Sequence, residues 1–216
     1  VIPYLDDLTE SARLIGAVNT VLHQDGLLIG HNTDGIGFFK SLETLRAFHV
    51  RNKRLTILGG GGASTAIIAQ AAIDGAKEIT IFCRPQSVER TVVTVQTIAQ
   101  STGVSLQVLP NNDSQLLAEH INNSDLLING TSVGMDGTSL PLPATIRFPE
   151  ELLVADVIYQ PFETPLLKMA NSQGNPTING LGMLLFQAAE AFELWTGKEM
   201  PTDLIWQLLV QKYDIK

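Results

Sequence analysis

The stretch LTILGGGGASTAIIAQAAIDGA, residues 55–76, decides the fold that this sequence predicts. It passes from an apolar run into four consecutive glycines at 59–62 and then into an alanine-rich segment. The apolar run is typical of a buried strand and alanine is the strongest helix former, so the glycines join a strand to a helix. Glycine adopts the unusual backbone angles that such a tight junction needs.

The same succession of a short apolar run and a helical stretch recurs along the chain. The apolar runs cover residues 54–59, 78–83, 104–109, 125–130, 152–158 and 176–180. The helical stretches between the first four runs cover residues 63–74, 87–101 and 113–122. Continuous apolar strands that alternate with helices are the pattern of a parallel sheet covered on both faces. We therefore predict an α/β fold, a doubly wound, Rossmann-like sheet of six parallel strands in residues 50–180.

The segments that flank residues 50–180 have other patterns. Two extended runs, 17–23 and 27–30, are joined through Asp25 and Gly26, a dipeptide that favours a β-hairpin turn. Amphipathic patterns predict helices over 181–197 and 202–213. Before the hairpin, apolar residues recur at a helical spacing, at Ile2, Leu5, Leu8, Ala12 and Ile15. We expect a helix there too, and a division of the chain into parts 1–49, 50–180 and 181–216.

The glycine-rich turn predicts a site for a dinucleotide. Gly59 allows the tight turn, Gly61 lets backbone N–H groups approach a diphosphate, and the following helix directs its positive end at the anion. The spacing departs from G-x-G-x-x-G, because Ser64 stands at the third glycine position. A plain tight turn is the alternative, but the strand, turn and helix context favours the nucleotide.

The end of the next strand selects between cofactors. An NAD site usually has an acidic residue there for the ribose 2′-hydroxyl, whereas this sequence has Cys83 and Arg84. A guanidinium attracts a 2′-phosphate, so we favour NADP, with NAD as the alternative if Arg84 is only a solvated side chain.

Composition and charge narrow the class of partner. The 216 residues carry a formal net charge of −8 and a single cysteine, which excludes an internal disulfide. Nucleic acid and anionic membranes are held by basic surfaces, so we expect neither and favour a small-molecule substrate. The four histidines have no metal-ligand spacing, so no metal is expected. The sequence has no long apolar run and no recognisable signal peptide, so we expect a cytoplasmic location.

Six motifs in one order resemble the family of shikimate dehydrogenase and quinate/shikimate dehydrogenase. They are IGAVNTV (15–21), GHNTDGIGF (30–38), LGGGGAS (58–64), NGTSVGM (129–135), DVIYQPFETPLL (156–167) and NGLGMLLFQAAEAFELWTG (179–197). The family reduces 3-dehydroshikimate to shikimate with NADPH, a step in the biosynthesis of aromatic amino acids. Its other members use NAD or quinate.

The resemblance implies a role for particular residues. Asp34 takes the place of the family's catalytic aspartate, and the substrate contacts fall on Asn19, Asp34, Tyr159 and Gln187. The cofactor contacts fall on Gly59, Gly60, Gly61, Gly62, Ala63, Cys83, Arg84, Thr131, Val157, Gly180 and Met183.

The departures from the family pattern concern the other half of the site. The family's S-x-S element for the substrate carboxylate and its catalytic lysine have no counterpart here, and Arg84 is followed by Pro85 instead of completing an Asn-Arg-Thr pattern. We therefore interpret residues 1–49 as the remnant of a substrate domain, 50–180 as the dinucleotide-binding domain and 181–216 as helices that pack toward that remnant. We expect a truncated enzyme with impaired catalysis, whose uncovered apolar surface favours a homodimer. A non-catalytic NADP-binding module and a dehydrogenase of the methylenetetrahydrofolate type are the alternatives.

The local sequence gives one of these residues a purely structural alternative and supports the role of another as a substrate contact. Asp34 precedes a helical run, GIGFFKSLETL, and is a candidate for its N-cap. Gln187 lies on a helical face that is otherwise apolar, with Leu184, Ala188 and Ala191, where we expect its amide to be buried and in need of a partner.

Overall fold

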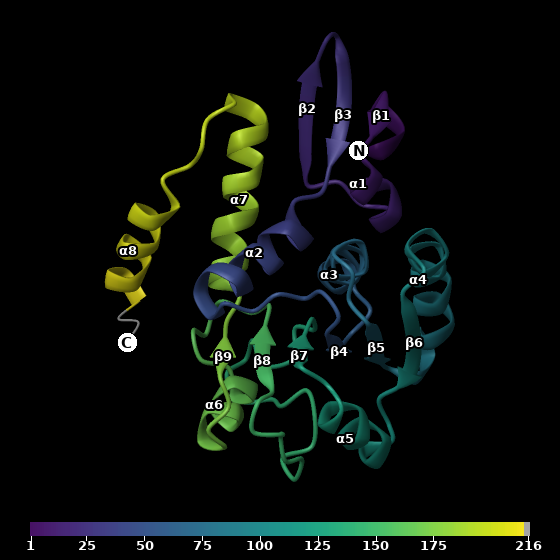
Figure 1. Ribbon diagram of the computed structural model, residues 1–216, viewed down its shortest axis with the longest axis vertical. Coiled ribbons are helices and arrows are strands. Elements are labelled where there is room, and N and C mark those ends of the chain that lie inside the picture. The colour runs from purple at the N-terminus through teal and green to yellow at the C-terminus, as the bar shows by residue number, and fades with distance from the viewer. Residues whose placement is uncertain (214–216) are drawn as a thin grey trace.

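The structure, a computed structural model that describes residues 1–213, is built around a six-stranded parallel sheet (Figure 1). Its strands are β4 (Arg54–Leu58), β5 (Glu78–Cys83), β6 (Ser105–Pro110), β7 (Leu126–Asn129), β8 (Leu153–Asp156) and β9 (Thr177–Ile178). They lie side by side in the order β6-β5-β4-β7-β8-β9, and every pair is parallel. This is the predicted doubly wound α/β fold, and the strand order reverses its direction at β4, where a crevice opens beyond the strand ends.

Helices cover both faces of this sheet. In Figure 1, α3 (Gly62–Ile73) and α4 (Val88–Thr102) lie above the strands, and α5 (Ser114–Asn122) and α6 (Pro165–Ser172) lie below them. Neighbouring strand residues point into opposite cores: Ile57 packs with α3 and α4, whereas Leu58 packs with α5 and α6. Because both faces of the central strands are buried, most of their positions are apolar, which is why their pattern was readable from the sequence.

A smaller sheet stands apart from the larger one, at the top of Figure 1. Its strands β1 (Asp7–Leu8), β2 (Thr20–Gln24) and β3 (Leu27–His31) have the order β1-β3-β2. Strands β2 and β3 form the predicted antiparallel hairpin. Asp25 and Gly26 at its turn have φ values of 53° and 84°, as a two-residue turn that matches the strand twist requires.

The continuous helix expected from the apolar spacing over residues 2–15 is wrong. A 3-10 helix, η1 (Ile2–Tyr4), is followed by β1 and only then by α1 (Glu10–Ile15). The backbone N–H of Asp6 donates to the Leu28 carbonyl (2.9 Å), and its carboxylate accepts from the Leu28 N–H (2.7 Å). These long-range bonds hold the segment beside β3, where its N–H groups are no longer available for helical bonds.

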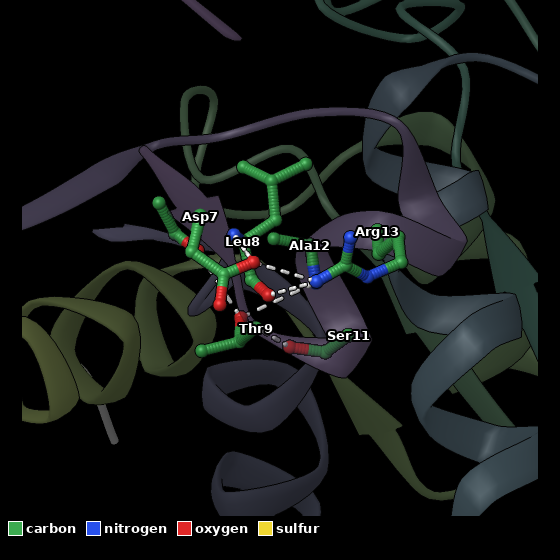
Figure 2. A network of polar contacts seen from close by, with 7 residues as sticks. Asp7, Leu8, Thr9, Ser11, Ala12 and Arg13 are labelled. Carbon is green, nitrogen blue, oxygen red and sulfur yellow. Dashed lines mark hydrogen bonds and ion pairs between the residues drawn. The ribbon is translucent and has the colours of Figure 1, made fainter. Parts of the chain in front are cut away.

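The junction between β1 and α1 has its own cap, shown in Figure 2. The Thr9 side chain accepts from the Ala12 N–H at the start of α1. Arg13 reaches back from the helix and donates to the Asp7 carboxylate and the Leu8 carbonyl, both at 2.8 Å. This network fixes where α1 begins, and Ala12 is buried against the core as the apolar spacing had predicted.

Three further helices flank the two sheets. Helix α2 (Asp34–Arg46) lies between α3 and α7 (Leu181–Thr196), and α8 (Thr202–Tyr213) lies beside α7 (Figure 1). Trp195 of α7 donates its indole N–H to the Val21 carbonyl of β2 (3.0 Å), so α7 joins the larger sheet to the smaller one. The boundaries 1–49, 50–180 and 181–216 stay a prediction, and residues 214–216 of the last part lie outside the described residues.

Within residues 1–213, the search for a helix long and apolar enough to span a bilayer finds none.

Candidate functional site

A cavity of about 380 Å³ opens at the carboxyl ends of β4, β5 and β7. Six of the residues expected to contact the cofactor line it: Gly59, Gly60, Gly61, Cys83, Arg84 and Thr131. Gly62 and Ala63 are not in its lining, because α3 already begins at Gly62. The glycine-rich turn, the end of β5 and the end of β7 therefore meet where the sequence predicted a dinucleotide.

The backbone of the turn explains its glycines. Gly59 has φ +98°, in the left-handed region, and a side chain there would overlap Thr131. A side chain on Gly60 would collide with Thr91 of α4. At Gly61 and Gly62 the space that a Cβ would occupy is open. The first two glycines serve the turn itself, and the next two leave backbone at the helix N-terminus that a phosphate can approach.

One end of this cavity is basic. Arg84 follows β5, and the lining also includes Arg90, which the sequence interpretation missed, with Ser87 and Asn111. Both arginines are exposed, and neither guanidinium has an ion-pair partner among residues 1–213. Arg90 was recognisable in the segment IFCRPQSVER, because it lies in the first turn of α4, the helix that follows β5. Cys83 is buried, as expected of a small apolar residue at a strand end.

A second cavity, of about 590 Å³, lies between the loops that follow β7 and β8. Thr131 lines both cavities, and the expected Val157 and Tyr159 line this one. Gly180 and Met183 are outside its lining: both are buried, and the Gly180 N–H donates to the Ile158 carbonyl (3.0 Å). A side chain at Gly180 would overlap the Val157 carbonyl, so glycine here brings the start of α7 against this loop.

Beneath these loops lies a buried carboxylate that the sequence interpretation did not single out. Asp156, at the end of β8, is 1% exposed and is hydrogen-bonded to Asn129, Ile158 and Thr164. Burial raises the pKa of Asp156 to about 6, against the lowering effect of these hydrogen bonds. Its position in the apolar run 152–158, at the start of the motif DVIYQPFETPLL, was the signal that could have found it.

The Asp34 carboxylate belongs to a polar cluster at the start of α2. Asn19 donates from Nδ2 to Asp34 Oδ1 (2.9 Å) and to Thr33 Oγ1 (3.1 Å), and lies 3.5 Å from Gln187 Oε1. Asp34 is half-buried, and its burial raises the pKa of the carboxyl above the usual range while the Asn19 hydrogen bond lowers it. Three of the four predicted substrate contacts, Asn19, Asp34 and Gln187, are thus adjacent.

The N-cap interpretation of Asp34 is wrong. Thr33 occupies the cap position, and Asp34 is the first residue of α2. Its backbone N–H donates to Asn32 Oδ1 (3.1 Å), and its carboxylate takes the Asn19 amide instead of a helix N–H. The carboxylate is therefore held by Asn19 in the polar cluster and does not cap the helix.

Close helix packing places Gln187 in this cluster. A Cβ on Gly37 of α2 would overlap the backbone of Gln187, and one on Gly182 of α7 would overlap Ser41. The glycines let α2 and α7 touch directly, so Asp34 and Gln187 converge on Asn19. The expectation of a buried amide is wrong, because Gln187 is only half-buried and Leu184 is 41% exposed. Part of the side of α7 that is apolar in sequence is therefore exposed to solvent.

Among the residues that the structure describes, no cluster of His, Cys, Asp and Glu side chains has the arrangement of a metal site.

The sequence and the fold are similar to those of shikimate dehydrogenases. A family model for the shikimate 5′-dehydrogenase C-terminal domain matches residues 180–210. The NADP(+) shikimate dehydrogenase of Streptococcus suis strain 05ZYH33 is 82% identical over 216 residues, which are all of this chain and 75% of that protein. The chain thus spans about three quarters of that relative's length.

Solved structures agree with this match. Shikimate 5-dehydrogenase from Listeria monocytogenes, in complex with shikimate and NAD, has a TM-score of 0.90 at 44% identity, over 96% of this chain and 73% of that one. The ligand-free 5-ketofructose reductase of Gluconobacter strain CHM43 has a TM-score of 0.84 at 37% identity, over 98% of this chain and 74% of that one. The motifs, the fold and these identities lead to one conclusion: the chain belongs to the shikimate dehydrogenase family.

Proposed function

We propose that this protein is an NADP-dependent shikimate dehydrogenase, which interconverts 3-dehydroshikimate and shikimate. The observation that carries the proposal is the cluster of Asn19, Asp34 and Gln187, polar groups suited to ring hydroxyls. Helices α2, α3 and α7 connect this cluster to the glycine-rich crevice. The 82% identical Streptococcus suis relative is named for this activity and cofactor.

The residues of the crevice fit NADP. The open backbone at Gly61 and Gly62 is a cradle for the diphosphate. Arg84 and Arg90 present two guanidinium groups for a 2′-phosphate, which each can bind with two parallel hydrogen bonds. Loss of the Asn-Arg-Thr pattern at Arg84 is offset by the second arginine. NAD is the alternative cofactor, since the Listeria monocytogenes relative was solved with NAD.

The remaining contacts fall along the loops that line the two cavities. Val157, Thr131 and Tyr159 line the second cavity, and we propose that the first two contact the cofactor and that Tyr159 contacts the substrate. Gly180 supports this wall through its hydrogen bond to Ile158, and Met183, buried in the first turn of α7, is proposed as a further cofactor contact. Gly59, Gly60, Ala63 and Cys83 complete the cofactor side.

Asp34 is the proposed acid/base residue. A bound nicotinamide cofactor supplies or takes the hydride at the ring carbon of the substrate. The proton on the oxygen of that carbon must move at the same time, so a titratable group has to lie within hydrogen-bond reach. Asp34 accepts that hydroxyl proton, and Asn19 orients the carboxylate by donating to one of its oxygens. The raised pKa of Asp34 makes its carboxylate a better proton acceptor than an ordinary surface aspartate.

The family's lysine is the missing partner of this step. Within residues 1–213, the Asn19 amide contacts the side chains of Asp34, Thr33 and Gln187. No lysine is among the residues of this cluster. We therefore expect the 216-residue chain to bind cofactor and substrate but to oxidise shikimate slowly, if at all. A shikimate oxidation rate equal to that of a full-length relative would refute this expectation.

Calorimetric titration of the NADP-saturated chain with shikimate tests the substrate site. Asp34→Asn and Asn19→Ala each remove a polar contact, and we expect each to weaken shikimate binding by about tenfold while NADP binding stays unchanged. Arg46→Ala, in the same helix as Asp34 but at its far end, is the matched control. Quinate binding tighter than shikimate would assign the protein to the quinate-using branch, and unaltered shikimate binding in Asp34→Asn would refute the assigned role.

Three wider proposals rest on the same family assignment. We propose that residues 1–49 and 181–216 belong to the substrate side and 50–180 to the cofactor side. The chain forms a homodimer through exposed apolar residues such as Leu204 and Leu208 of α8, which are 56% and 55% exposed. Sedimentation as a monomer over a wide range of concentration would refute the dimer.

We also propose that the protein is located in the cytoplasm. Cell fractionation tests this proposal.

A further inference from the structure

Asp156 is a buried charge that is bound only by neutral groups. Its two carboxylate oxygens accept from Asn129 Nδ2 (3.1 Å to each), from the Ile158 N–H (3.0 Å) and from Thr164 Oγ1 (2.7 Å). No cation appears among the hydrogen-bond and ion-pair partners of Asp156 within residues 1–213. Burying a carboxylate without a cation is costly, so a residue kept in this state needs a reason beyond filling the core.

The hydrogen bonds of Asp156 lead into two loops. On one side, Asn129 Oδ1 accepts from the Thr131 N–H (3.1 Å) and from its hydroxyl (2.7 Å), while Asn129 Nδ2 also donates to the Val133 carbonyl (3.0 Å). On the other side, Ile158 is the second residue of the loop after β8, and Thr164 ends that loop by capping α6. One carboxylate thus joins the residues at the ends of loops 130–135 and 157–164.

These two loops form the second cavity. Every residue that lines it comes from 130–135 or from 157–160. We infer that Asp156 is a positioning residue, which sets the spacing of these loops and thereby the part of the site that binds the reactive end of the dinucleotide. This inference rests on the proposed function for the identity of the ligand. The tether, by which we mean the hydrogen bonds of Asp156 that join the two loops, does not depend on it.

The chemistry of the side chain explains why an aspartate is used. A carboxylate only accepts, and its two oxygens offer about four lone-pair positions for the three donor groups. An asparagine has a single acceptor oxygen, and its NH₂ would face the Nδ2 donor of Asn129. Asp156→Asn therefore keeps the shape of the residue but loses part of the tether.

The test combines two readouts on the full 216-residue chain. Amide hydrogen exchange without cofactor reports the loops directly, and calorimetric titration with NADP reports the consequence for binding. For Asp156→Asn we expect exchange in 130–135 and 157–160 to rise about tenfold and NADP affinity to fall about tenfold. Thr80→Val is the matched control, since it removes a buried hydrogen bond to His120 at the opposite end of the sheet.

A second variant separates positioning from loss of stability. Asn129→Asp combined with Asp156→Asn restores an amide facing a carboxylate and keeps an acceptor for Thr131. We expect this double variant to regain only part of the affinity that Asp156→Asn loses, because the Val133 carbonyl loses its donor and a single amide oxygen remains for Ile158 and Thr164. Asn129→Asp alone, with two facing carboxylates, should bind worse than either.

The outcomes distinguish this inference from the proposed function. Loop exchange and affinity unchanged in Asp156→Asn, or an equal loss of affinity in Thr80→Val, would overturn the positioning role. If the unmodified chain binds no NADP while Asp156→Asn still loosens both loops, the proposed function fails and the tether stands.

Discussion

Replacement of Asp156 by asparagine should remove one contribution to the pH dependence of the protein's stability. The pKa of this carboxyl is about 6 in the folded protein and 3.8 as its ordinary value, and one pKa unit corresponds to about 1.4 kcal/mol. Between about pH 4 and pH 6 the unfolded chain has released this proton while the folded protein still holds it. The contribution of Asp156 to the free energy of unfolding therefore falls by about 3 kcal/mol in all as the pH rises from below this window to above it, and stays low at higher pH.

Urea unfolding of the protein and of Asp156→Asn, at about pH 4 and about pH 7, measures this effect. Asparagine does not titrate, so the variant should gain about 2 kcal/mol relative to the unmodified protein on going from the lower to the higher pH, because at about pH 4 the unfolded chain has already released part of this proton. Asp34 and Asp74 also have a raised pKa, but they are present in both proteins and cancel in the difference. A stability difference that is the same at both pH values would refute the buried, raised-pKa carboxylate.

Four further substitutions, with one control, test the cofactor side and the helix contact. Arg84→Ala and Arg90→Ala should each weaken NADP binding about tenfold or more and leave NAD binding within about twofold, by calorimetry; equal losses for both cofactors would contradict a 2′-phosphate contact. Gly59→Ala should cost about 1–3 kcal/mol in urea unfolding, because φ is +98°, and also weaken NADP binding, whereas Gly103→Ala, at φ +72° and far from the cavity, should cost stability alone. Gly37→Ala should destabilise by about 1–3 kcal/mol, because the methyl group overlaps the α7 backbone, and should weaken shikimate binding; a neutral effect would mean that α2 and α7 separate easily.

The larger sheet was predictable because its strands follow a rule that is local in sequence. The central strands are buried on both faces, so residues such as Ile57 and Leu58 are apolar in succession, although they enter different cores. The hairpin turn was equally local, since Asp25 and Gly26 carry the positive φ values themselves.

The first residues of the chain show where local reasoning fails. Leu5, Leu8 and Ala12 have the spacing of a helical face, but Asp6 is bound through its backbone and side chain to Leu28. A partner 22 residues away decides the conformation, and no pattern within the segment reports it.

The candidate site divides in the same way. The Gly59 turn and Asp34 were predicted, the first from its strand and helix context and the second from the resemblance. Arg90 was missed although helix geometry alone places it near the strand end. Asp156 was missed for a deeper reason: its role depends on burial and on partners 27 and 8 residues away, which only the folded protein brings together.

The central claim, that this chain carries an NADP site of the shikimate dehydrogenase family, is tested most directly by calorimetric titration with NADP and, separately, with NAD. Arg84 and Arg90, the two arginines proposed to bind the 2′-phosphate, should make NADP bind at least about tenfold more tightly than NAD. Tighter binding of NAD, or no binding of either dinucleotide, would contradict the account.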